Sequence, residues 1–69
     1  MPEVVLNGES CSLPEGATVA DAVRRSGVSS DGRGVAAALD GEVVVRGAWD
    51  ATVLGTAARV EVLQAVQGG

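Results

Sequence analysis

The chain contains no histidine, lysine, phenylalanine or tyrosine, and it has one cysteine and one tryptophan. Without histidine and lysine it lacks the commonest acid–base side chain and every side-chain amine that could form a Schiff base or an isopeptide bond. With Cys11 as the single cysteine, no disulfide can form within the chain, so nothing indicates an oxidising compartment. These absences disfavour a catalytic role and predict no metal site.

The length of 69 residues predicts one small domain, close to the lower limit for a core that holds together without metal or disulfides. Trp49 is the single aromatic residue, so valine, leucine and alanine must supply most of the core. A chain of this size leaves no room for a large catalytic cleft. We therefore expect a protein that is not an enzyme.

Nine acidic residues against five arginines give a formal net charge of −4. This charge disfavours binding to nucleic acid and to anionic membranes, and it favours a basic protein partner. The first 13 residues lack the basic region of a signal peptide, and glycine, aspartate or arginine interrupts the later apolar segments. The sequence thus predicts a cytoplasmic protein with no membrane span.

The first half of the chain reads as a hairpin followed by a helix. Asn7-Gly8 is the strongest two-residue hairpin signal, and β-favouring segments at 4–6 and 9–13 flank it. Thr18 and Asp21 have the spacing of a capping box, which predicts the start of a helix of about two turns. Gly27 fits the position just after its end.

The second half reads as another hairpin, a crossing loop and a last strand. Asp40-Gly41 is the predicted turn between strands at 35–39 and 42–45, and the irregular segment 46–52 should fold Trp49 back onto the core. The last strand is predicted at 59–65. With one helix covering one face of a mixed sheet, this order predicts an α+β fold of the β-grasp (ubiquitin-like) type.

The chain ends in Gly68-Gly69, two residues after the last predicted strand. Glycine has no Cβ and tolerates positive φ, so such a tail is narrow enough to thread into another protein's active site. We therefore predict a β-grasp domain at 1–65 and a flexible tail at 66–69. In that tail Val66, Gln67 and Gly68 would thread into the partner, and the carboxylate of Gly69 would react.

Several short motifs in this order resemble the ThiS family of ubiquitin-like sulfur carriers, within the ThiS/MoaD superfamily. They are Asn7-Gly8, the segment 14–21, the hairpin 38–44, Trp49, and the final strand with its terminal Gly68-Gly69. The resemblance implies that Gly69 is adenylated and then converted to a thiocarboxylate that donates sulfur to thiazole formation. It also implies three partners: a ThiF-type adenylyltransferase that consumes ATP, a ThiG-type thiazole synthase, and a sulfur donor such as a cysteine desulfurase. No cofactor would be bound by the carrier itself.

Three other interpretations remain open. The related small subunit of molybdopterin synthase usually has a Pro-Pro pair before its Gly-Gly, whereas this chain has none at 63–67, which favours the thiazole branch. A ubiquitin-like protein modifier would use the same Gly-Gly end. The absence of lysine excludes only polymers in which one copy of the modifier is linked to a lysine of another copy. The third alternative is a plain interaction domain.

Strand alternation places Leu63 on the face opposite Val60 and Val62, away from the helix. An exposed leucine close to the tail predicts a docking residue for a partner, and Val5 with Val44 or Val45 could extend it to a patch. Single exposed apolar residues are also common, so Leu63 could simply be tolerated there.

The sequence also makes predictions for Cys11 and for the turn at Ala57-Ala58. Cys11 is in phase with Leu13 on the second strand, which predicts a buried structural cysteine rather than a thioester-forming one. The ThiS family commonly has Gly-Asp in the turn before the last strand, whereas this chain has Ala57-Ala58. A positive φ at Ala57 would cost about 1–2 kcal/mol.

Overall fold

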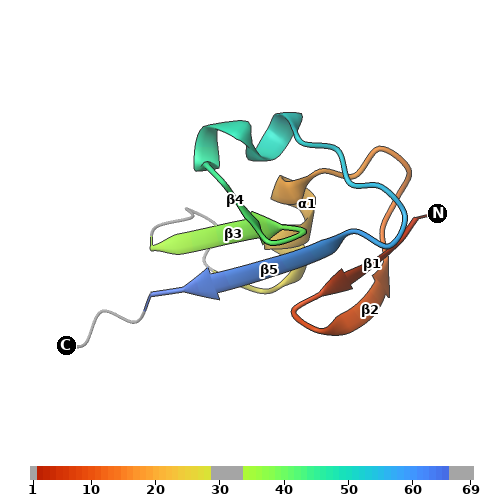
Figure 1. Ribbon diagram of the computed structural model, residues 1–69, viewed down its shortest axis with the longest axis horizontal. Helices are drawn as coiled ribbons and strands as arrows, with labels where there is room; N and C mark the ends of the chain where they lie inside the picture. Colours follow the sequence, from red (N-terminus) through yellow and green to blue (C-terminus); the bar gives the residue numbers. More distant parts are fainter. Residues whose placement is uncertain (1, 29–33, 66–69) are drawn as a thin grey trace.

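A mixed five-stranded sheet forms the centre of the molecule (Figure 1). The structure, a computed structural model, describes residues 2–28 and 34–65. In these residues the strands are β1 (Glu3–Leu6), β2 (Glu9–Ser12), β3 (Val35–Leu39), β4 (Glu42–Val44) and β5 (Arg59–Gln64), in the order β2-β1-β5-β3-β4. The last strand thus lies in the middle of the sheet, parallel to β1 and antiparallel to β3. The predicted β-grasp arrangement is confirmed.

Both hairpins turn as predicted. Asn7 and Gly8 have φ values of 50° and 83°, and Asp40 and Gly41 have 50° and 88°. Positive φ at both central residues is the type I′ geometry, whose twist matches that of the flanking strands. Asparagine and aspartate tolerate this left-handed conformation better than other residues with a Cβ. The local sequence therefore determined where each hairpin folds.

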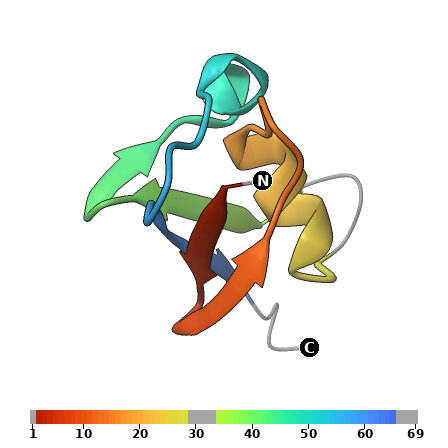
Figure 2. The same ribbon diagram turned by 90° about the vertical axis from the view of Figure 1, so that its right-hand side faces the viewer.

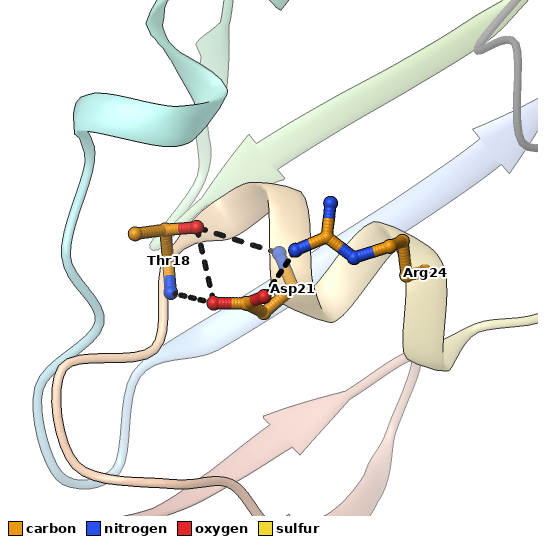
Figure 3. A network of polar contacts seen from close by, with 3 residues as sticks. All are labelled: Thr18, Asp21 and Arg24. Atoms are coloured by element: carbon orange, nitrogen blue, oxygen red, sulfur yellow. Dashed lines mark hydrogen bonds and ion pairs between the residues drawn. The ribbon is translucent and has the colours of Figure 1, made fainter.

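The one α-helix in the described part of the chain, α1 (Val19–Arg25), begins at the predicted capping box (Figure 3). The Thr18 N–H donates to Asp21 Oδ2 at 2.9 Å, and the Asp21 N–H donates to Thr18 Oγ1 at 3.4 Å. Arg24 pairs with the same carboxylate from one turn further along. At the other end Ser26 caps the helix and Gly27 follows with a φ of 86°, as expected for the residue after a helix.

The capping box predicts a pH dependence of stability. The hydrogen bond from the Thr18 N–H is the main cause that lowers the pKa of Asp21 below its ordinary value of 3.8, and Arg24 lowers it further. A carboxyl group whose pKa is lower in the folded state stabilises the fold at neutral pH, and that contribution is lost as the pH falls through the folded-state pKa. We expect Asp21→Asn to lower the thermal midpoint by a few degrees at pH 7 and to have no effect well below pH 4. A midpoint difference that persists in acid would contradict an origin in the charge.

The segment after β4 differs from the prediction, because it is a 3₁₀-helix, η1 (Arg46–Ala51), and not an irregular loop. The Ala48 N–H donates to the Val45 carbonyl, and the Trp49 indole N–H donates to the Val44 carbonyl at 2.8 Å. Burying the large indole while satisfying its N–H requires a tight turn at this point. The expected packing of Trp49 onto the core is confirmed, since its side chain is buried.

The core lies between the sheet and the layer formed by α1 and η1 (Figure 2). Val4, Val19 and Val60 are its largest fully buried side chains, and they come from β1, α1 and β5. The remaining core members in the described part of the chain are Leu6, Leu13, Ala17, Ala20, Ala22, Val23, Ala37, Trp49, Leu54, Ala58 and Val62. Because these residues are mostly small, each one contributes little buried area, and the domain depends on many of them together.

Ala57 adopts the left-handed conformation, with a φ of 68°. Its N–H donates to the Glu3 carbonyl at 2.7 Å, so tertiary contacts hold the turn before β5 in this shape. The family's glycine would carry no Cβ penalty here, whereas alanine does.

We expect Ala57→Gly to stabilise the domain by about 0.5–1 kcal/mol, because relief of the left-handed penalty exceeds the extra entropy of glycine in the unfolded chain. That gain corresponds to a rise of about 2–8 °C in the thermal midpoint. The matched control is Ala58→Gly, which removes a buried methyl group at a residue without positive φ and should destabilise the fold. Equal effects of the two substitutions would contradict the strain.

Candidate functional site

The face of the sheet that points away from α1, called the outer face here, carries the alternate residues Arg59, Glu61 and Leu63 of β5. Val60 and Val62 point into the core with 0% and 4% exposure, whereas Leu63 is 72% exposed. The predicted alternation of the last strand is therefore confirmed. An apolar side chain of this size in solvent, beside the end of the strand that leads to the tail, makes the outer face the candidate docking surface.

A shallow groove of about 200 Å³ lies beside Leu63. On β3, Ala36 is opposite Leu63 and Ala38 is opposite Glu61, while Val43 on β4 is opposite Ala38. The groove arises because two small alanines lie between larger side chains on the neighbouring strands. Its lining residues are Asn7, Ala36, Ala37, Ala38, Val43, Glu61 and Leu63.

The valines predicted to extend the patch around Leu63 require a correction. Val44 is half-buried and packs against the core, because it shares the face of Ala37. Val45 is exposed but lies after β4, at the start of η1. Val5 does lie on the outer face, opposite Arg59, although it is half-buried. The valine that lines the groove is Val43, which is 77% exposed.

Two hairpin residues bind the backbone of β5 through their side chains, which the sequence analysis missed. Asn7 Oδ1 accepts from the Val62 N–H at 2.8 Å, and Asp40 Oδ1 accepts from the Arg59 N–H at 2.9 Å. The Asx residue of each turn was visible as a hairpin signal. The sequence did not show which strand would lie beside each turn, because the neighbouring strand depends on how the sheet is assembled. These bonds fix β5 on both sides at the base of the candidate docking surface.

The end of β5 is fixed by a third contact. The Ala65 N–H donates to the Gly34 carbonyl at 2.7 Å, and a Cβ on Gly34 would lie 3.6 Å from that of Ala65. Gly34 has a φ of 69°, which explains why glycine suits this position. The predicted tail residues Val66, Gln67, Gly68 and Gly69 lie outside the described residues, so the structure places the strand that leads to them and not the tail itself.

The remaining features are Cys11, potential metal ligands and potential membrane-spanning helices. Cys11 of β2 lies opposite Val4 of β1, so its side chain faces the helix layer. It is half-buried against the core, which is less buried than predicted. Residues 2–28 and 34–65 contain no cluster of three potential metal ligands. None of their helices is long and apolar enough to cross a bilayer.

Comparison with known proteins agrees with this arrangement. The model of the ThiS family matches residues 4–69 of the chain. Among solved structures, the chain is similar to the thiamine biosynthesis protein ThiS from Geobacter metallireducens, with 29% sequence identity and a TM-score of 0.75 over 97% of this chain and 99% of that one. A search of curated proteins found no match. The chain therefore belongs to the ThiS family, the non-catalytic sulfur carriers of thiamine biosynthesis.

Proposed function

We propose that this protein carries sulfur as a thiocarboxylate on Gly69 and delivers it to thiazole formation. The observation that carries the proposal is the extent of the family match, which runs from residue 4 to Gly69 and so includes the tail that would react. In this proposal a ThiF-type adenylyltransferase activates the tail, a cysteine desulfurase or similar donor supplies the sulfur, and a ThiG-type thiazole synthase receives it. The single cysteine of the chain agrees with a cytoplasmic location.

The chemistry proceeds in steps that all use groups of the partners. The Gly69 carboxylate attacks the α-phosphorus of ATP, releases pyrophosphate and becomes a mixed anhydride with AMP. The outer sulfur of a persulfide then displaces AMP and forms an acyl disulfide. A second thiol attacks the inner sulfur of that disulfide, which leaves the thiocarboxylate on Gly69 and a disulfide between the two thiols. ATP is consumed by the adenylyltransferase, and the carrier itself needs no cofactor.

The carrier contributes a rigid body and an unhindered end. Asn7, Asp40 and Gly34 fix β5 through three hydrogen bonds, so the tail at 66–69 starts from a constant point on the domain. Leu63 lies two residues before Ala65 on the outer face and would dock the adenylyltransferase there. A partner that binds the outer face thereby receives the tail in a reproducible position, which is what a reaction at a terminal carboxylate requires.

The test is to incubate the chain with ATP, a ThiF-type adenylyltransferase and a sulfur donor, and to measure its mass. We expect one oxygen to be replaced by one sulfur, with the change located at Gly69 by fragmentation. Addition of a ThiG-type thiazole synthase with its substrates should then restore the carboxylate and yield thiazole phosphate. Omission of ATP is the control, and it should leave the mass unchanged.

Two outcomes would replace the proposal. Formation of molybdopterin with the large subunit of molybdopterin synthase, without any thiazole product, would assign the chain to the molybdopterin branch. Covalent conjugates with other proteins, without a thiocarboxylate intermediate that the thiazole synthase consumes, would identify a protein modifier.

A further inference from the structure

Among the residues that the structure describes, Glu61 is the single charged one that lines the groove beside Leu63. It lies directly opposite Ala38 and two residues before Leu63 on the same face of β5. Apart from Asn7, the other described lining residues are apolar. Ala36 and Ala38 provide the floor, and the exposed side chains of Val43 and Leu63 rise on either side. The groove thus combines an apolar floor with one negative charge.

Glu61 has no ion-pair partner within the described part of the chain. The one ion pair found among residues 2–28 and 34–65 joins Asp21 and Arg24 on α1. Arg59 is the nearest cation along β5, but it lies no closer than 4 Å to any described carboxylate, and Asp40, which binds its backbone N–H, adds a second negative charge beside it. Glu61 and Asp40 thus place two negative charges against the one positive charge of Arg59 on this part of the sheet, and the chain as a whole carries a net charge of −4.

We infer that the groove accepts a basic side chain of the adenylating partner, with its alkyl stem over Ala36 and Ala38 and its cation paired with Glu61. Arginine and lysine have this chemistry, because both bury an apolar stem along an apolar surface and extend a charge beyond it. Docking would bring a cation to a carboxylate that forms no ion pair with the described residues, in surroundings that lose water when the groove is filled. This inference rests on the proposed function.

Leu63 and Glu61 would have different roles in docking. Leu63 would supply apolar contact area, which determines how tightly the carrier binds. Glu61 would select a partner with a cation at the matching position, which determines which protein binds and in which orientation. A specificity role for Glu61 is separate from the reaction at Gly69.

The experiment compares Glu61→Gln with Glu15→Gln in ATP-dependent adenylation by the ThiF-type enzyme, at several NaCl concentrations. Both residues are exposed and both substitutions remove one negative charge, but Glu15 lies in the turn before α1 and does not line the groove. At low salt we expect Glu61→Gln to raise KM for the carrier about tenfold with kcat unchanged, and to remove most of the increase in KM that salt causes in the unmodified chain. Glu15→Gln should change KM less than about twofold.

Each outcome supports or overturns the inference. An unchanged KM for Glu61→Gln, or a raised KM with the salt dependence retained, would overturn the pairing of Glu61 with a cation, while adenylation of the unmodified chain would leave the proposed function standing. If the unmodified chain is not adenylated at all, the proposed function itself fails. Circular dichroism of both variants checks that the fold is unchanged.

Discussion

Deletion of Gly69 should abolish activation by the adenylyltransferase and leave the thermal midpoint unchanged. The shortened chain still ends in a glycine carboxylate, but that carboxylate is drawn back by about 3.5 Å, the length of one extended residue. A misplacement of this size in an active site costs at least about 100-fold in rate. The core residues of the described chain all precede residue 63, so the fold has no need of the last glycine. ATP–pyrophosphate exchange and thermal unfolding measure the two effects separately.

Two further variants separate the effect of the carboxylate's position from the effect of a side chain at residue 69. One residue added after Gly69 displaces the carboxylate in the other direction and should be equally inactive, whereas Gly69→Ala keeps the length and adds only a Cβ. Gly69→Ala should therefore retain more exchange than either length variant if position limits the reaction, and as little as they do if the channel of the partner excludes a side chain. Full exchange activity in the Gly69 deletion would rule out activation at the terminal carboxylate.

Val62→Asp should unfold the domain, whereas Leu63→Asp should leave it folded and disrupt docking. Val62 is 4% exposed, and its replacement loses about 1.5–3 kcal/mol of apolar burial and places an unpaired charge in the core. A domain of 69 residues has a total stability of only about 3–10 kcal/mol. Leu63 is 72% exposed, so the same substitution there changes the stability little. If Leu63 is a docking residue, the Leu63→Asp substitution should raise KM for adenylation by at least about 30-fold.

The two variants serve as controls for each other, because they make the same chemical change one residue apart on one strand. Circular dichroism reports the fold, and the KM of adenylation reports docking for any variant that stays folded. A folded Leu63→Asp protein with the KM of the unmodified chain would remove Leu63 from the docking surface. An unfolded Leu63→Asp protein would show that the alternation seen in β5 does not govern stability.

Local sequence determined those features of this protein that depend on neighbouring residues alone. Asn7-Gly8 and Asp40-Gly41 specify their turns because few residues other than these types tolerate positive φ. Thr18 and Asp21 specify the start of α1 because their hydrogen bonds join groups three residues apart. The alternation of β5 determined which of its side chains are buried, since successive residues of a strand point to opposite faces.

The tertiary structure alone decided which individual residues meet across neighbouring strands, and hence the composition of the candidate docking surface. Asn7 Oδ1 meets the Val62 N–H across 55 residues of sequence because β5 inserts between β1 and β3. The same insertion places Ala36 and Ala38 beside β5 and brings Val43 to the groove. A hydrophobic pattern reports the face on which a residue lies but carries no information on the strand beside it. The groove next to Leu63 is therefore a property of the assembled sheet and could not be predicted from any one segment.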